Sequence, residues 1–295
     1  MRIALVFLLV SAGLCSPAQG AATPFELGDQ GGVVVKASLN GRGPFRLLLD
    51  TGSTHSAVSE AVAAAIGAPA VAKAVLGSAT GGREVMVVRV DALVCGALVV
   101  RELMASVAAF DRLGGTDGIQ GVIGQDALAS VRYTIDFRRR ELLWWPGASA
   151  RGISFPLQGS RGRFVIALPQ GGNTLRLVPD SGAATLLLFD PPKNLPLTLL
   201  SQHGTLTTMS ARGTVRLARM RKLRFGAAVL QDVAAVVVSR NRSEPEETDG
   251  LLPLHLFDRV TFDGPGGLLI LEGSALHQSS RRPDVFLMTA SARQP

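Results

Sequence analysis

Cysteine is nearly absent from this sequence, which excludes the class of small exported domains that disulfides hold together. Of the 2 cysteines in 295 residues, Cys15 falls in an apolar N-terminal segment and Cys95 in the body of the chain. A positive Arg2, an apolar run and then small residues are typical of a secretory signal peptide. We therefore expect residues 1–20 to be removed and the protein to be exported, periplasmic or secreted. Cys95 is then the one thiol left, and no intramolecular disulfide can form.

Aromatic and charged residues are also scarce, at 5% and 18%, with 1 Tyr and 2 Trp. The formal net charge of +7 comes mainly from Arg, in clusters at residues 138–140 and 216–224. A nucleic-acid-binding protein places stacking aromatics beside such patches, and Tyr and Trp are few in this chain. We expect no nucleic-acid partner and interpret the clusters as solvated strand faces and turns. Weak attraction to an anionic envelope surface is the alternative.

Long apolar runs and metal-ligand patterns are missing as well. After the signal segment no apolar run could span a bilayer, so we expect no stable membrane insertion. Lipidation at Cys15 is an alternative anchor, although the bulky Leu14 directly before it is unfavourable. The 4 His and Cys95 show no ligand spacing, so we predict no metal and no cofactor.

The residues that are abundant indicate strands. Apolar residues make up 47% of the chain, with 33 Gly and 16 Pro, which is typical of a folded, turn-rich protein. Val, Leu and Ile outnumber strong helix formers in most windows, so a mainly β fold is expected. The length suffices for one large domain or two of moderate size.

Strand and turn signals follow one another closely along the first half of the chain. Asn40-Gly41 is a hairpin signal between two apolar runs, and Ser59 is a candidate cap for a short helix at residues 59–66. The second of these runs ends at Asp50. The pattern predicts strands at 32–38, 45–49, 85–94, 97–107, 133–137 and 141–145, with a helical turn at 125–129.

Two triplets of one kind stand out, Asp50-Thr51-Gly52 and Asp180-Ser181-Gly182. Each follows a largely aliphatic run, where a carboxylate is costly to bury unless it is paired or hydrogen-bonded. From average residue usage, roughly 0.1–0.2 such triplets are expected in a chain of this length. Two triplets in matching apolar settings therefore need a common explanation.

The spacing of other landmarks supplies that explanation. Asp180 follows Asp50 by 130 residues, since 180 − 50 = 130, and the same subtraction gives 130 for Gly226 and Gly96. It gives 131 for Gly213 and Gly82, and 129 for Gly250 and Gly121. A nearly constant offset indicates an internal duplication, and a repeat this long predicts two like lobes.

Two such lobes would bring the carboxyl groups of Asp50 and Asp180 together. Two carboxylates a few ångströms apart do not both ionise readily, so they share a proton and titrate as a pair. One can then act as general base on a water while the other polarises a carbonyl. The Thr or Ser beside each Asp is expected to reach the opposite loop, and the Gly to allow close approach.

These residues match a known family. Residues 48–53, Leu-Leu-Asp-Thr-Gly-Ser, resemble the active-site motif of aspartic proteases, and residues 121–124, Gly-Val-Ile-Gly, are similar to the segment that supports it. Residues 25–273 resemble bilobal bacterial retropepsin-like and pepsin-like aspartyl proteases. The resemblance implies a mainly β fold of two tandem acid-protease β-barrel lobes related by a pseudo-twofold axis. It further implies an aspartic-type endopeptidase with Asp50 and Asp180 as the catalytic dyad, a peptide or protein substrate and no cofactor.

The resemblance also implies supporting roles and boundaries. Thr51, Gly52, Ser53, Ser181 and Gly182 are expected to support the dyad. Two hairpin tips are expected to close over the substrate as flaps, namely Ala79, Thr80, Gly81 and Gly82 in the first lobe and Ala211, Arg212 and Gly213 in the second. The predicted domains are a signal peptide at 1–20, an N-terminal lobe at 21–148, a C-terminal lobe at 149–273 and a tail at 274–295.

The second lobe departs from the pattern in three places. Ala183 stands where the first lobe has Ser53, a hydroxyl expected to hydrogen-bond its Asp. Pro253 replaces the second Gly of the supporting segment, and Pro179 precedes Asp180. Because Pro lacks an N–H donor, we expect the support of Asp180 to differ from that of Asp50.

Two alternatives remain open from the sequence. One is a non-catalytic peptide-binding protein on a protease scaffold, since fold does not determine function. The other replaces the expected monomer by a homodimer in which two first lobes supply the dyad. His55, close to Asp50 in sequence, is interpreted as a polar surface residue and Cys95 as a core residue.

Overall fold

The computed structural model describes residues 22–28, 31–78, 81–110, 118–147, 151–207, 212–239 and 248–273. The predicted signal peptide and tail lie outside these residues, as do the flap positions Ala79, Thr80 and Ala211. The lobe boundaries at 21–148 and 149–273 stay a prediction.

The first lobe consists of short strands that alternate between buried and exposed positions, with two short helices. The helix predicted at residues 59–66 is observed one residue later, as α1 Glu60–Ala65. Ser59 is its N-cap and accepts a hydrogen bond from Val62 N. The elements are β1 Thr23–Leu27, β2 Val33–Leu39, β3 Arg42–Leu49, β4 Ala57–Val58, α1 Glu60–Ala65, β5 Ala70–Ser78, β6 Gly81–Cys95, β7 Leu98–Val107, β8 Gly121–Ile123, α2 Gln125–Leu128, β9 Arg132–Asp136 and β10 Glu141–Trp144.

The second lobe repeats this order, except that two strands stand in the place of β1 and no helix corresponds to α1. Residues 190–196, which follow β15, contain Pro191, Pro192 and Pro196, and Pro disfavours helix both at its own position and at the residue before it. The elements are β11 Ile153–Pro156, β12 Gln158–Ser160, β13 Arg163–Gln170, β14 Asn173–Asp180, β15 Leu186–Phe189, β16 Leu197–Thr207, β17 Arg212–Phe225, β18 Ala228–Val238, β19 Gly250–Pro253, the 3-10 helix η2 Leu254–Leu256, β20 Arg259–Asp263 and β21 Leu268–Glu272.

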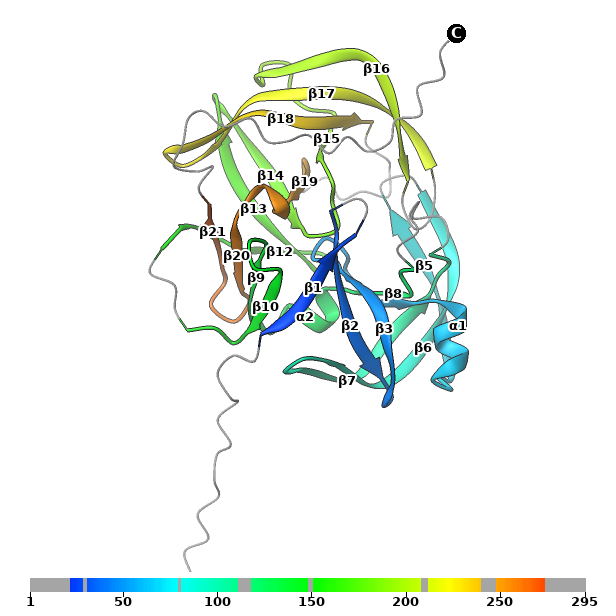
Figure 1. Ribbon diagram of the computed structural model, residues 1–295. Coiled ribbons are helices and arrows are strands. Elements are labelled where there is room, and N and C mark those ends of the chain that lie inside the picture. Colours follow the sequence, from blue (N-terminus) through cyan, green and yellow to red (C-terminus); the bar gives the residue numbers. More distant parts are fainter. Residues whose placement is uncertain are drawn as a thin grey trace, which may run out of the picture.

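The strands form two sheets (Figure 1). The larger has the order β11-β21-β20-β9-β10-β1-β2-β3-β8-β4-β7-β6-β5, and an additional β2–β6 pairing closes the first lobe into a barrel. The smaller has the order β12-β13-β14-β19-β15-β18-β17-β16. The predicted mainly β fold with two like lobes is confirmed.

The pseudo-twofold axis passes between β9 and β20, which pair antiparallel at the junction of the lobes. At its centre the hydroxyls of Thr134 and Thr261 lie 2.7 Å apart in a hydrogen bond. On either side the ion pairs repeat: Arg132 contacts Asp263 at 3.1 Å, and Arg259 contacts Asp136 at 3.2 Å. Each pair joins one lobe to the other, so the two halves are held in one relative position.

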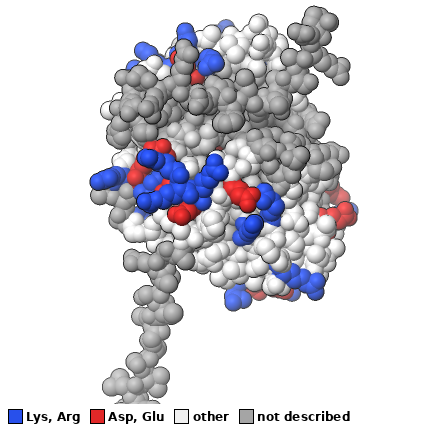
Figure 2. Space-filling view, in the orientation of Figure 1, with Lys and Arg blue, Asp and Glu red and all other residues white. Residues whose placement is uncertain are grey.

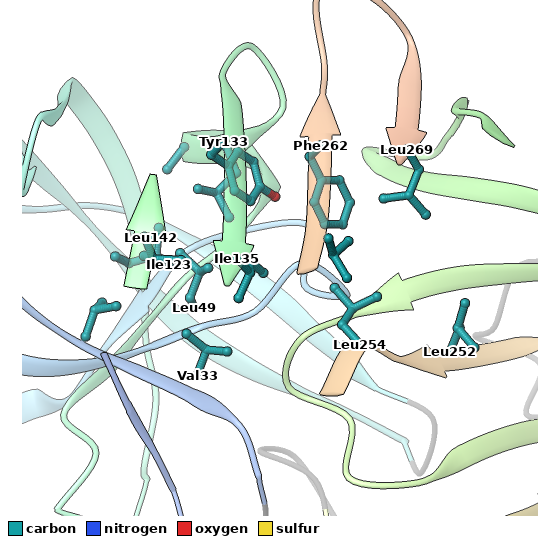
Figure 3. Close-up of a cluster of buried hydrophobic side chains, with 14 of the residues drawn as sticks. Val33, Leu49, Ile123, Tyr133, Ile135, Leu142, Leu252, Leu254, Phe262 and Leu269 are labelled. Carbon is teal, nitrogen blue, oxygen red and sulfur yellow. The ribbon is translucent and has the colours of Figure 1, made fainter. Parts of the chain in front are cut away.

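One apolar core runs through both lobes (Figure 3). Leu49 and Ile123 of the first lobe and Leu252 and Leu254 of the second belong to it, and all are fully buried. In the same core Tyr133 and Phe262 stack with ring centroids 5.0 Å apart. A core that is continuous across the axis makes the position of one lobe depend on the other.

Cys95 lies in the same core with no exposed surface. Burial raises the pKa of its thiol to about 12, so the group stays neutral and unreactive at ordinary pH. Its interpretation as a core residue is confirmed.

Surface charges of opposite sign are interspersed. On the face shown in Figure 2, acidic side chains lie beside the groups of basic ones. Arg46 pairs with Glu26 at 2.7 Å, and Arg221 pairs with Asp232 at 3.1 Å. Within the described parts of the chain, no helix is both long and apolar enough to cross a membrane.

Candidate active site

Asp50 stands at the end of β3, where a parallel strand supports it. β8 pairs with β3, placing Ile123 beside Leu49, and the Asp50 N–H donates to the Ile123 carbonyl at 3.0 Å. Gly121 begins β8, and a Cβ there would lie 2.6 Å from the Ala57 carbonyl oxygen. The Gly therefore permits the close strand packing on which the position of Asp50 depends.

Asp180 stands at the corresponding end of β14. Its supporting strand β19 runs parallel with Pro253 beside Asp180, and a Cβ at Gly250 would collide with the Leu187 carbonyl. The expected difference from the support of Asp50 lies after the strand: β19 is present, and the η2 turn, with Leu254 where the first lobe has Gln125, replaces α2. Pro179 is tolerated because it lies beyond the last β13–β14 pair, Ile166 with Leu177, where that ladder needs no further N–H.

Each Asp accepts two backbone N–H bonds from the turn that follows it. Asp50 Oδ1 accepts from Gly52 N at 3.0 Å and Ser53 N at 3.1 Å. The equivalent bonds to Asp180 Oδ1 come from Gly182 N at 2.7 Å and Ala183 N at 3.1 Å.

The role expected for the Ser53 hydroxyl is therefore wrong. Its Oγ donates to the His55 carbonyl at 2.9 Å instead of to Asp50. The bond to Asp180 comes from the backbone N–H of residue 183 and does not depend on the side chain there. Ala183 therefore gives Asp180 the same hydrogen bond that Ser53 gives Asp50.

Thr51 and Ser181 join the two loops by reciprocal bonds across the axis. Thr51 Oγ1 donates to the Pro179 carbonyl at 2.7 Å and accepts from Ser181 N at 3.0 Å. Ser181 Oγ donates to the Leu49 carbonyl at 2.5 Å and accepts from Thr51 N at 3.1 Å. Both side chains are buried, so each loop holds the other in place.

The structure brings the two carboxyl groups into direct contact, with a side-chain hydrogen bond between Asp50 and Asp180. The glycines make this possible. A Cβ at Gly52 would overlap the Asp180 carboxyl, with its Cγ 2.5 Å away, whereas a Cβ at Gly182 would lie 3.1 Å from Asp50 Cγ. The approach is thus tighter on the first-lobe side.

The surroundings of the two carboxyls give them different pKa values. Burial raises the pKa of Asp50, and the hydrogen bonds from Asp180 and from the backbone of Gly52 and Ser53 oppose that rise. Burial raises the pKa of Asp180 well above its ordinary value, and the neighbouring Asp50 charge raises it further. Asp180 is the group that retains its proton to higher pH, and Asp50 is the one that ionises first.

Arg163 is a contributor that the sequence did not reveal. Its positive charge lowers the pKa of Asp50. Gly162 beside it lies against the first lobe, where a Cβ would be 3.6 Å from Thr54 Cγ2. The β12–β13 turn of the second lobe thus carries a cation towards the first lobe's carboxyl.

A second group that the sequence did not reveal ties the Asp50 loop to α2. Asp126 Oδ2 accepts from Ser56 N at 2.8 Å and Asp126 Oδ1 from Ser56 Oγ at 2.7 Å, while Ser56 Oγ also accepts from Gly124 N at 3.0 Å. Gln125 Nε2 donates to the Thr51 carbonyl at 2.8 Å. The sequence predicted a helical turn at 125–129, but it did not predict which residues Gln125 and Asp126 contact, because the tertiary fold determines those contacts.

At the equivalent positions the second lobe has Leu254 and His255, since 254 − 125 = 129 and 255 − 126 = 129. His255 is exposed, yet partial desolvation of its ring lowers its pKa, and a hydrogen bond with the Ala183 backbone opposes that shift. His55 in the first lobe is exposed and contacts Thr54 Oγ1 through Nδ1 at 2.8 Å. Its interpretation as a surface residue agrees with this position.

Two long hairpins rise at the predicted flap positions. β5 and β6 pair up to Ser78 with Gly81, which places Gly81 and Gly82 at the start of β6. β16 and β17 pair up to Thr207 with Arg212, and Gly213 is paired with Leu206. Their tips, including Ala79, Thr80 and Ala211, lie outside the described residues.

Among the described residues, no group of three or more His, Cys, Asp or Glu side chains could hold a metal ion. The site as described consists of two carboxyls, backbone donors and hydroxyls.

Comparison with known proteins finds similarity to aspartyl proteases, in sequence over part of the first lobe and in fold over most of the chain. Residues 35–127 match the family described as aspartyl protease. The aspartic proteinase from Irpex lacteus shares the fold with a TM-score of 0.51, at 11% sequence identity, over 88% of this chain and 99% of that chain. No curated protein sequence matches this chain.

The family match over part of the first lobe and the fold shared over both lobes support an aspartyl protease family assignment. The matched residues include Asp50 but not Asp180, so the position of the second carboxyl is known from the structure.

Proposed function

We propose that this protein is an aspartic-type endopeptidase that hydrolyses peptide bonds with a water held between Asp50 and Asp180. The observation that carries the proposal is the hydrogen-bonded pair of carboxyls at the lobe junction. Each carboxyl keeps two backbone donors, and the loops are joined by Thr51 and Ser181.

The reaction follows from the unequal pKa values of the pair. Ionised Asp50 removes a proton from the water as its oxygen attacks the peptide carbonyl carbon, and protonated Asp180 gives its proton to the carbonyl oxygen. When the tetrahedral intermediate collapses, the C–N bond breaks and the leaving nitrogen takes the proton from Asp50. The hydroxyl proton returns to Asp180, which restores the starting state.

The pH dependence follows from the same pair. Activity needs one carboxyl ionised and one protonated, so kcat/KM should be bell-shaped between the two macroscopic pKa values of the dyad. Both are raised above the ordinary 3.8 of Asp. We therefore expect the acid limb above that value and the alkaline limb well above it.

We propose that the substrate is an extended peptide or unfolded protein segment covered by the two hairpins β5–β6 and β16–β17. An extended peptide can add backbone hydrogen bonds to a strand edge, and hairpins that close would exclude water from the dyad. We also propose export to the periplasm or the outside of the cell, and a monomeric active form.

The test uses fluorophore-labelled casein, unfolded in solution, with cleavage measured from pH 3 to pH 8. Asp50→Asn and Asp180→Asn should each abolish cleavage, because either change removes the shared proton system. Asp91→Asn is the matched control, since Asp91 is an exposed residue paired with Arg89, and it should leave the rate unchanged.

Two outcomes would contradict the proposal. No cleavage by the wild type at any pH would favour a non-catalytic peptide-binding protein. Full activity of Asp180→Asn, with a doubled molar mass in solution, would favour a homodimer whose two first lobes supply the dyad.

A further inference from the structure

Gln125 is a buried polar residue that packing alone does not explain. It is the first residue of α2 and only 2% exposed. Its Nε2 donates to the Thr51 carbonyl at 2.8 Å, which sets the direction of the amide, because a carbonyl only accepts. Its Oε1 is buried with no hydrogen-bond partner among the residues that the structure describes.

Leu254 shows what the fold by itself accepts at this position. It follows Gly250 as Gln125 follows Gly121, it is fully buried, and it lies in the shared apolar core. Burying an amide with one end unbonded is unfavourable compared with burying a Leu. The presence of an amide at residue 125 therefore indicates that this side chain does more than fill space in the core.

The Thr51–Gly52 peptide connects Gln125 to the site. Its carbonyl accepts from Gln125, and its N–H, on Gly52, donates to Asp50 Oδ1 at 3.0 Å. A peptide group is planar, so fixing the carbonyl direction also fixes the direction of the N–H. The second lobe has Leu254 at the corresponding position, and a Leu side chain has no donor for the peptide that bonds Asp180.

We propose that Gln125 is a positioning residue for Asp50: its amide holds the Thr51–Gly52 peptide so that the Gly52 N–H stays aimed at the carboxylate. The interaction favours the ionised form of Asp50 and helps to make it the base of the pair. This role rests on the proposed function, because it concerns the same reaction.

The first test compares Gln125→Met, Gln125→Glu and Gln170→Met on a quenched peptide built around a casein bond that the wild type cleaves. Gln170 is the matched control: it is 1% exposed, and its Nε2 donates to the Arg224 carbonyl at 2.7 Å, away from the dyad. Gln125→Met should lower kcat by about tenfold to a hundredfold with little change in KM, because a small misorientation is costly to catalysis and Gln125 does not touch substrate.

Gln125→Glu provides a readout that a merely structural role would not affect. A Glu donates to the Thr51 carbonyl only when it is protonated. The ratio of its kcat/KM to that of the wild type should therefore rise as pH falls, while the ratio for Gln125→Met stays low at every pH. The other charged or titratable groups near this loop, Asp180, Arg163, Asp126 and His55, are unchanged in all variants.

The second test does not depend on activity. Carbon-13 NMR titration of labelled Asp carboxyls should show the lower apparent pKa of the dyad raised in Gln125→Met and unchanged in Gln170→Met. If the wild type cleaves nothing, the proposed function fails, and this titration still decides the role of Gln125.

The proposal is overturned if Gln125→Met matches Gln170→Met both in kcat, within about twofold, and in the dyad titration. It is also overturned if the Gln125→Glu ratio does not change with pH. If Gln125→Met does not fold, as a thermal melt would show, the Gln125→Glu ratio decides alone, because Glu keeps the size and shape of Gln.

Discussion

The two lobes place their carboxyls in nearly the same way but hold the loops around them differently. In both lobes a parallel strand supports the Asp and two backbone N–H groups bond it. In the first lobe, side chains of Gln125 and Asp126 also tie the loop to α2. The second lobe has Leu254 and His255 at these positions.

This difference shows which contacts depend on side-chain identity. Backbone donors bond Asp180 although Ala183 and Pro179 depart from the first-lobe sequence. The bonds from Gln125 and to Asp126, by contrast, depend on the side chains of these two residues, which the second lobe does not have at the equivalent positions. The lobe with more side-chain ties is the one whose Asp ionises first.

The largest expected effect is at the two glycines beside the dyad. Gly52→Ala would push its Cβ into the Asp180 carboxyl, whereas Gly182→Ala would bring one only to 3.1 Å from Asp50 Cγ. We expect kcat/KM to fall by about a hundredfold or more for Gly52→Ala and by about tenfold for Gly182→Ala. Steady-state kinetics at the optimum pH measures both, and equal losses would show that the approach is symmetric.

The next effect concerns how firmly each loop is held. Asp126→Ala removes the acceptor for both Ser56 N and Ser56 Oγ, so we expect the free energy of unfolding to fall by about 2 kcal/mol. His255→Ala removes a single bond with the Ala183 backbone and should cost about 0.5 kcal/mol. Urea unfolding of both variants provides the comparison, which breaks down if the second-lobe change costs as much as the first.

The pH dependence of stability should reveal the buried proton on Asp180. Its folded pKa is raised, so the folded state binds more protons than the unfolded chain. The resulting stabilisation is full below the unfolded value of about 3.9 and is lost as pH rises through the folded value, at roughly 1.4 kcal/mol per unit of difference.

In Asp180→Asn the free energy of unfolding should therefore depend less steeply on pH above about 3.9. Urea midpoints at several pH values measure the slope, and Asp91→Asn is the control. An unchanged slope in Asp180→Asn would show that Asp180 does not retain its proton in the folded state.

The smallest effect is expected for Ser53→Ala, which gives the first lobe the residue of the second. The hydroxyl bonds the His55 carbonyl at an exposed position, and the bond to Asp50 comes from the backbone. We expect kcat/KM to change by less than about twofold and stability by about 0.5 kcal/mol. A loss near tenfold would mean that Ser53 Oγ acts on Asp50 during the reaction.

Much of the fold could be predicted because local patterns repeat. The Asn40-Gly41 turn, the apolar run up to Asp50 and the Ser59 cap are short-range signals, and the structure has β2, β3 and α1 where they predict them. β1 was not predicted, because its five residues carry little pattern and pair with strands far along the chain. The helix missing after β15 shows that duplication preserves a plan only where local residues allow it.

The site could be predicted in part for the same reason. The Asp triplets are local motifs with a constant offset, so the sequence identifies both carboxyls and their glycines. Gln125, Asp126 and Arg163 carry no local mark, because their roles depend on which loop they meet. Ser53 was misjudged, since a side chain seemed to be needed where a backbone N–H sufficed.

By itself the sequence determined a duplicated, mainly β chain with one Asp-Thr/Ser-Gly loop in each half. Only the tertiary structure decided that the two carboxyls share a hydrogen bond and that their pKa values diverge. The physical reason is that strands and turns follow from neighbouring residues, whereas desolvation and charge coupling depend on groups about 130 residues apart that meet only when the lobes close around one core.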